Sequence, residues 1–208
     1  MRYSVHNLCF EESTALQLKW ALYTSGRLSK LIADNLVRSV RLRIDWLDEK
    51  WTSPGCFGLT ILPGRKDWDR DLATDLATLK EEDVNRVLCL VPQEELQHYG
   101  VDRLLSDYEE AGLLAYHLSI VDQKACNIED MTAALRWVDD GLNAGDRVLV
   151  HCVGGLGRSG MAAAAYLRTR GAEVEEAIEA VREARSQRAL ETAVQEKFIQ
   201  DFPATALK

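Results

Sequence analysis

Residues 148–160 read Val148-Leu149-Val150-His151-Cys152-Val153-Gly154-Gly155-Leu156-Gly157-Arg158-Ser159-Gly160. The apolar start is typical of a buried strand, the middle is a glycine-rich turn, and a helix pattern follows directly. Open α/β sheets bind ligands at the C-terminal ends of their strands, so this turn should line a binding site. Glycines let the backbone curl with its N–H groups inward, and the helix adds free N–H groups and its positive dipole end. The pattern therefore predicts an anion cradle of phosphate size.

Three side chains of this stretch can carry chemistry. Cys152 opens the turn, where a helix N-terminus and a nearby cation favour the thiolate, which is the nucleophilic form of cysteine. Arg158 can hold two phosphate oxygens with its planar fork, and Ser159 can donate a hydrogen bond to the sulfur. A buried cysteine that serves only as a small hydrophobic residue is the structural alternative. The predicted phosphate-binding residues are Val153, Gly154, Gly155, Leu156, Gly157 and Arg158.

Strand and helix patterns alternate along the rest of the chain. Strands are expected over 40–46, 57–62, 86–91, 113–120 and 147–151. Helices are expected over 71–82, 94–99, 102–111, 128–143, 159–170, 174–185 and 192–202. This alternation predicts an α/β fold with a central, mostly parallel sheet flanked by helices. Two more helix patterns, over 11–23 and 28–37, predict an N-terminal helical extension over 1–38, ahead of a catalytic domain over 39–208.

The charge of the chain bears on its partners. The 208 residues include 25 Lys plus Arg and 33 Asp plus Glu, which gives a net charge of −8. This sign disfavours nucleic acid and anionic membranes as partners. Between Arg147 and Ala172, however, there are four arginines and neither Asp nor Glu. A phosphate would be drawn by this local field despite the overall charge.

The sequence also limits compartment and cofactors. Its longest apolar run, Met161–Leu167, falls far short of the roughly 20 residues of a membrane span. The first residues lack the apolar stretch of a secretory signal. The 5 cysteines are dispersed, with no Cys-x-x-Cys pair, which disfavours a disulfide framework and a metal site. We therefore expect a cytoplasmic protein that needs no metal and no cofactor.

His151–Ser159 matches the signature of the cysteine-dependent protein tyrosine phosphatase superfamily, His-Cys-x-x-Gly-x-x-Arg-Ser in this chain. From about residue 40 to 203 the chain resembles one branch, the kinase-associated dual-specificity phosphatases. The flanking matches are Ile44-Asp45-Trp46-Leu47, Leu62-Pro63-Gly64, Glu95-Leu96 and Ile120-Val121-Asp122. The resemblance implies a protein tyrosine phosphatase-like fold that hydrolyses phosphotyrosine, phosphoserine or phosphothreonine through a cysteinyl-phosphate intermediate. It also implies a phosphorylated protein substrate, with kinases among the candidates.

The chemistry also needs a general acid, because the leaving oxygen must receive a proton. The family carries this acid about 30 residues before the cysteine, and Asp122 matches that position. An aspartate that merely ends a strand is the alternative, and Glu129 and Asp130 are the other candidate acids. The stretch Gln123-Lys124-Ala125-Cys126 departs here from the glycine-rich, proline-containing sequence of the family.

The remaining candidate residues surround the signature. Gln195 falls where the family has a glutamine near the site, although an exposed helix glutamine fits the pattern equally well. Arg182 and Arg185 follow the family pattern and either brace the phosphate loop or remain solvated. His151 precedes the nucleophile and should point to the opposite face of the strand. We expect it to be a buried, hydrogen-bonded residue that tunes the loop.

Several alternatives stay open at this level. Cys89 and Cys126 are ordinary cysteines by pattern, yet either could act as a resolving thiol for an oxidised Cys152. The chain could be a phosphoprotein- or kinase-binding module with weak activity. It could also act on a phosphate ester that is not a protein. The absence of lysine from residues 153–157 disfavours the lipid and inositol phosphatases that the superfamily also contains.

Overall fold

The computed structural model describes residues 41–207, and a five-stranded sheet with the order β1-β2-β5-β3-β4 forms their centre. The strands are β1 (Asp45–Trp46), β2 (Cys56–Thr60), β3 (Val84–Cys89), β4 (Leu114–His117) and β5 (Arg147–His151). Only β1 runs antiparallel to its neighbour, and the other pairs are parallel. The predicted mostly parallel sheet is therefore confirmed. Because β5 is central, the loop that follows it lies at the C-terminal edge of the sheet, between β2 and β3.

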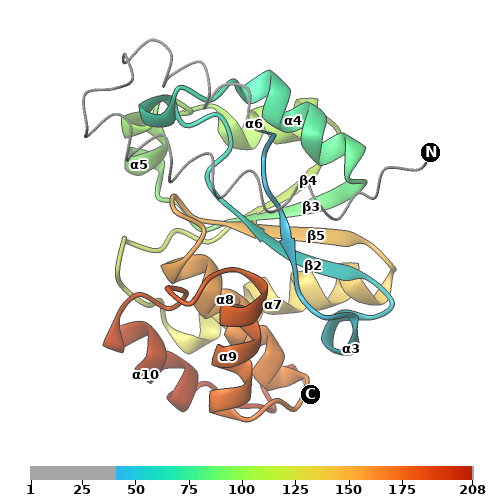
Figure 1. Ribbon diagram of the computed structural model, residues 1–208, viewed down its shortest axis with the longest axis vertical. Coiled ribbons are helices and arrows are strands. Elements are labelled where there is room, and N and C mark those ends of the chain that lie inside the picture. The colour runs from blue at the N-terminus through green and yellow to red at the C-terminus, as the bar shows by residue number, and fades with distance from the viewer. Residues whose placement is uncertain (1–40, 208) are drawn as a thin grey trace, which may run out of the picture.

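Helices cover both faces of the sheet (Figure 1). One side carries α4 (Leu72–Glu81), α5 (Gln93–His98) and α6 (Leu104–Glu110). The other side carries α7 (Ile128–Asn143), α8 (Gly157–Thr169), α9 (Val174–Ala184) and α10 (Ala193–Asp201). Two short elements that the sequence did not predict are α3 (Glu49–Thr52) and η2 (Lys66–Trp68). No helix within residues 41–207 is long and apolar enough to cross a membrane.

Two predicted strands are too long. Within the described residues, the strand expected over 40–46 is reduced to Asp45–Trp46, and the one expected over 113–120 is reduced to Leu114–His117. Beyond these segments, isolated hydrogen bonds replace the regular ladder, so tertiary contacts override the sequence periodicity. The other elements agree with their predicted bounds to within two residues. The expected helices over 11–23 and 28–37 lie outside the described residues, so the boundary at residue 38 stays a prediction.

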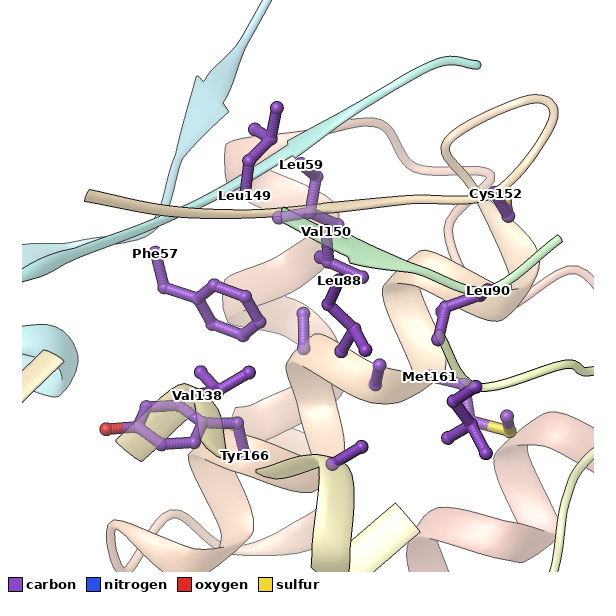
Figure 2. Close-up of a cluster of buried hydrophobic side chains, with 14 of the residues drawn as sticks. Phe57, Leu59, Leu88, Leu90, Val138, Leu149, Val150, Cys152, Met161 and Tyr166 are labelled. Atoms are coloured by element: carbon purple, nitrogen blue, oxygen red, sulfur yellow. The ribbon is translucent and has the colours of Figure 1, made fainter. Parts of the chain in front are cut away.

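A continuous apolar core joins the sheet to α8 and holds the start of the phosphate loop in place. The face of the sheet that covers α8 contributes Phe57 and Val150, both with no exposed surface, and α8 contributes Met161 and Tyr166 (Figure 2). The ring of Phe57 meets that of Tyr166 edge-on at a centroid distance of 5.4 Å. Each such side chain contributes about 1.5–3 kcal/mol on burial. Cys152 belongs to the same cluster, so its backbone is fixed by packing.

Candidate active site

The loop between β5 and α8 begins with Cys152, whose residue surface is only 3% exposed. Figure 2 shows Cys152 at the end of β5, where the chain turns above α8. Helix α8 begins at Gly157, two residues earlier than the sequence predicted. Its first N–H groups, which have no intrahelical partners, therefore follow directly on the loop. The resulting local environment suits a bound phosphate.

Gly155 fixes the curvature of this loop. Its φ is +64°, a left-handed conformation that favours glycine. A Cβ atom at this position would lie 2.3 Å from the carbonyl oxygen of Thr60 and 2.8 Å from Nη2 of Arg185. The loop therefore passes too close to the end of β2 to accept any side chain here.

We expect Gly155→Ala to lower both stability and activity. The substitution combines left-handed strain with a backbone clash, so the free energy of unfolding should fall by about 1–3 kcal/mol. Urea unfolding and hydrolysis of an aryl phosphate measure the two effects. Gly112→Ala is the matched control, because Gly112 has a φ of +82° and no atom within 4 Å of the added Cβ. Equal losses in the two variants would contradict the close approach at Gly155.

Arg158 joins three parts of the chain at this loop. It lies in the first turn of α8 with 1% of its surface exposed. Its Nη1 atom donates to Oε2 of Glu95 and to the carbonyl oxygen of Ile120, both at 2.9 Å. Its Nη2 atom lies 3.0 Å from Oδ1 of Asp122. The predicted arginine and the predicted acid are therefore brought together, and Glu95 of α5 joins them.

Three buried polar atoms beside the loop have no hydrogen-bond partner among the described residues: Nε of Arg158, Oγ of Ser159 and Oε1 of Gln195. Buried polar atoms are rarely left without a partner, so a cluster of them points to a ligand site. Ser159 does not make the hydrogen bond to the Cys152 sulfur that the sequence suggested. Its role in the departure of the thiolate stays a prediction.

Asp122 occupies the mouth of the site, with 59% of its side chain exposed. The connection that carries it, between β4 and α7, is held by a hydrogen bond of 3.3 Å from Oγ1 of Thr192 to the carbonyl oxygen of Gln123. Gln123 has a φ of +61°, so this loop turns without the glycine that the family has nearby. A hollow of about 480 Å³ is lined by Asp122 and Gln123 on one side and by residues 187–192 on the other. Asp122 therefore borders open space as well as the guanidinium of Arg158.

The other candidate acids lie in the first turn of α7. Asp130 is tied there by Asn127, whose Oδ1 accepts from its backbone N–H at 2.7 Å and whose Nδ2 donates to its carboxylate at 2.8 Å. Glu129 is exposed in the same turn. Negative side chains at this position stabilise the helix dipole. Among the three predicted acids, Asp122 is the one whose carboxylate pairs with Arg158.

Gln195 is 1% exposed, so the interpretation as an exposed helix residue is wrong. Thr192 caps α10 by accepting from the backbone N–H of Gln195, which turns the glutamine toward the start of α8. A Cβ atom added at Gly157 would lie 2.8 Å from Nε2 of Gln195 and 2.7 Å from Oε2 of Glu191. Gln195 therefore packs against the start of α8, and its part in the reaction stays a prediction.

His151 is fully buried and hydrogen-bonded, as expected. Its Nε2 atom lies 3.0 Å from the hydroxyl of Tyr108, and its Nδ1 atom lies 3.2 Å from the carbonyl oxygen of Cys152. Burial lowers the pKa of His151 to about 4, so the ring is neutral at pH 7. A neutral ring that donates from Nδ1 must accept at Nε2, which matches a Tyr108 hydroxyl that donates.

The two predicted bracing arginines differ. Arg185 donates from Nε to the carbonyl oxygen of Gly155 at 2.9 Å and from Nη2 to that of Gly154 at 3.4 Å. Arg182 instead pairs with Glu196 at 2.6 Å and donates to the carbonyl oxygen of Ala189 at 3.3 Å. Arg185 thus contacts the phosphate loop, whereas Arg182 ties α9 to α10.

The free cysteines near the site differ in placement. Cys89 is buried and pairs in register with His151, next to the nucleophile. Burial raises its pKa to about 12, and burial also raises the pKa of Cys126 to about 11. Neither is therefore poised as a thiolate at neutral pH. A resolving role for either thiol stays an open prediction. Residues 41–207 contain no group of three His, Cys, Asp or Glu side chains placed to hold a metal ion.

Three residues at the site escaped the sequence analysis as site residues: Arg65, Glu95 and Tyr108. Glu95 lay within a stretch that matched the kinase-associated phosphatases, which was the only available signal. Arg65 and Tyr108 contact the signature across 88 and 43 positions of the chain, respectively. No local pattern reports contacts of that range.

A buried cysteine that opens a glycine-rich anion cradle, with an arginine and an acid at its mouth, defines a cysteine-dependent phosphatase. Residues 64–172 match a family model described as "Polymorphic toxin system, DSP-PTPase phosphatase". Cyclin-dependent kinase inhibitor 3 of Sus scrofa is 31% identical over 166 residues, which cover 77% of this chain and 78% of that protein. The Homo sapiens protein of the same name is 30% identical with the same coverage.

Solved structures agree with these relatives. A structure of kinase associated phosphatase, with its catalytic cysteine replaced by serine, matches with a TM-score of 0.75 and 27% identity. The matched region covers 78% of this chain and 94% of the chain in that structure. The active form of Tk-PTP matches with a TM-score of 0.57 and 30% identity over 70% of this chain and 89% of that chain. The chain belongs to the dual-specificity phosphatase family and is a cysteine-dependent protein phosphatase.

Proposed function

We propose that this phosphatase acts on a phosphorylated kinase, with Cys152 as nucleophile, Asp122 as general acid and base, and Arg158 as the oxyanion ligand. One observation carries the assignment of roles: the carboxylate of Asp122 lies 3.0 Å from the guanidinium of Arg158 at the mouth of the loop that Cys152 opens. The kinase as substrate rests on relatives whose names refer to cyclin-dependent kinase and to a kinase associated phosphatase.

The first step transfers the phosphoryl group to the enzyme. The Cys152 thiolate attacks phosphorus, a sulfur–phosphorus bond forms, and the bond to the leaving oxygen breaks. Asp122 gives its proton to that oxygen. Arg158 and the loop N–H groups hold the equatorial phosphate oxygens as negative charge redistributes. The entering phosphate replaces Asp122 and Glu95 as partner of the guanidinium, which leaves Asp122 free to face the leaving group.

The second step returns the enzyme to its starting state. Water attacks phosphorus, and its proton passes to the Asp122 carboxylate. The sulfur–phosphorus bond breaks, which releases the thiolate and inorganic phosphate. Gln195 borders the loop, and its Oε1 atom and the hydroxyl of Ser159 have no hydrogen-bond partner within residues 41–207. The Gln195 oxygen is suited to orient the attacking water. The Ser159 hydroxyl is suited to donate a hydrogen bond to the departing thiolate.

Asp122→Ala should lower kcat for a phosphopeptide by about 100-fold or more, because general acid catalysis contributes about 10²–10⁴-fold. KM should change little, since the anion ligands remain. Asp130→Ala is the matched control, because it removes a carboxylate in the first turn of α7 whose hydrogen bond is to Nδ2 of Asn127. Steady-state kinetics measure both variants. A larger loss in Asp130→Ala than in Asp122→Ala would reassign the acid.

The same variant tests the substrate. Asp122→Ala should retain a phosphorylated kinase on a resin and not its dephosphorylated form, and vanadate should release it. Preference for phosphatidylinositol 5-phosphate would indicate a lipid substrate instead. That outcome has a basis, since the structure of PTPMT1 with PI(5)P is 25% identical with a TM-score of 0.52. Binding to the kinase regardless of phosphorylation, with negligible wild-type turnover, would indicate a binding module.

A further inference from the structure

The outer side of the phosphate loop is held by groups that lie outside residues 153–158. Four consecutive carbonyl oxygens, those of residues 152–155, have a hydrogen-bonding side chain beside them. The contacts are His151 Nδ1 to Cys152 at 3.2 Å, Arg65 Nη1 to Val153 at 2.9 Å, Arg185 Nη2 to Gly154 at 3.4 Å and Arg185 Nε to Gly155 at 2.9 Å. Two of the three side chains are guanidinium groups.

This arrangement has a direct consequence for the anion cradle. In a planar trans peptide the N–H of the next residue points opposite to the carbonyl group. Carbonyls that are held outward at 152–155 therefore turn the N–H groups of 153–156 to the inner side. The positive charges outside also favour an anion inside the loop. The outer contacts thus help to determine the geometry that binds phosphate.

The Arg65 side chain is fixed in place by several contacts. It is 5% exposed, and its Nε and Nη2 atoms bind the carboxylate of Asp67 at 2.8 and 2.6 Å. Its guanidinium lies 4.2 Å from the ring centroid of Trp68 and 5.0 Å from that of Tyr99. These contacts fix the plane of the guanidinium, so Nη1 remains directed at Val153. The backbone N–H of Leu62 donates to the same Val153 oxygen at 3.1 Å, so this carbonyl has two donors.

Asp45 supports the loop indirectly, through Arg185. Its side chain is 10% exposed, and its Oδ2 atom accepts from Nη1 of Arg185, whose remaining donors reach the loop. Arg43 pairs with Oδ1 of the same carboxylate at 2.7 Å. Asp45 lies in β1, so the edge strand of the sheet is connected to the phosphate loop through Arg185.

We propose that Arg65 and Asp45 are positioning residues of the phosphate loop, Arg65 by direct contact with Val153 and Asp45 through Arg185. The proposal deepens the function proposed above and rests on it, because it assumes that this loop binds phosphate. Loss of Arg65 leaves the Leu62 N–H as the remaining partner of the Val153 carbonyl, and loss of Asp45 removes the carboxylate that holds Arg185 against the loop. In either case a loop peptide is less firmly oriented, so its inward N–H donor is less well aligned with a phosphate. Phosphate affinity and kcat/KM should both fall, while the reacting side chains stay in place.

The test measures phosphate binding without catalysis. Inorganic phosphate should protect Cys152 from iodoacetamide, and the phosphate concentration that halves the inactivation rate gives its Kd. Arg65→Gln and Asp45→Asn should each raise this Kd by about 10-fold, as expected for one hydrogen bond to a charged group. Arg65→Lys keeps a donor and a charge, so its Kd should lie between those of the wild type and Arg65→Gln. Urea unfolding of each variant records stability separately.

Arg86→Gln is the matched control. Like Arg65, Arg86 contacts an aromatic ring, a carboxylate and a carbonyl. Its guanidinium lies 5.2 Å from the ring centroid of Trp137, Nε donates to Asp146 at 2.6 Å, and Nη1 donates to the carbonyl oxygen of Trp137 at 3.4 Å. It lies in β3 away from the loop. Unchanged phosphate Kd in Arg65→Gln and Asp45→Asn overturns the proposal, and so does an equal rise in Arg86→Gln. If phosphate does not protect Cys152 in the wild-type protein, the proposed phosphate site is refuted. This result distinguishes failure of the proposed function from failure of the positioning proposal.

Discussion

Replacing Cys152 by serine should abolish hydrolysis of an aryl phosphate, with kcat lowered by at least about 1,000-fold, as expected when a covalent nucleophile is lost. A serine hydroxyl is a far weaker nucleophile than a cysteine sulfur, and it does not ionise near neutral pH. The substitution is nearly isosteric in a residue that is 3% exposed. The loop should therefore keep its shape and still bind phosphate.

The comparison that makes this result informative is Cys56→Ser. Cys56 lies at the start of β2, opposite Arg147, at the N-terminal end of the sheet. Its substitution should leave turnover unchanged. Phosphate affinity of Cys152→Ser, measured by calorimetry, should remain within a few fold of the wild-type value, since the N–H groups and Arg158 persist. Undiminished turnover in purified Cys152→Ser would falsify covalent catalysis by this residue.

Arg158→Lys should lower kcat by about 100–1,000-fold, the range seen when a preorganised oxyanion donor is removed. Arg158 directs two nitrogen atoms to three acceptors, and its Nε atom is buried without a partner among the described residues. A lysine supplies one point charge on a flexible stem and cannot reproduce a planar fork. The charge is conserved, so a large loss would assign catalysis to the geometry of the guanidinium.

Arg86→Lys again provides the control for the loss of a partly buried arginine. We expect Arg86→Lys to lower the free energy of unfolding, because it disturbs the ion pair with Asp146, and to change kcat much less than Arg158→Lys does. Glu95→Gln adds a second comparison, because it removes one carboxylate from Arg158 and keeps the fork. We expect Glu95→Gln to lower kcat less than Arg158→Lys does. A kcat for Arg158→Lys within threefold of wild type would contradict the role of the fork.

These substitutions also separate the alternatives that the sequence left open. If the chain were a binding module with weak activity, replacing Cys152 would lower turnover only slightly. Binding, and not turnover, would then be its function. Three buried polar atoms at the loop favour a phosphate ligand. The acidic surplus of the chain, with a net charge of −8, suits a substrate with a basic surface around its phosphorylated residue.

Local chemistry explains why so much of the fold could be predicted. Helices such as α7 and strands such as β5 agree with their predicted bounds because their apolar periodicity and end signals lie within the element. The predicted strands over 40–46 and 113–120 were too long because alternation records which residues are half-buried. Whether a neighbouring strand continues the ladder is a tertiary property.

The sequence by itself determined the chemistry of this protein. Cys152, the glycine-rich turn and Arg158 lie within seven consecutive positions, so the backbone alone brings nucleophile, N–H groups and cation together. Only the tertiary structure decided how this loop is held and completed. Asp122, Glu95 and Gln195 reach it from separate elements, and Arg65 and Asp45 support it from outside. Such contacts join residues far apart in the chain, and packing of the whole sheet against its helices is what sets their distances.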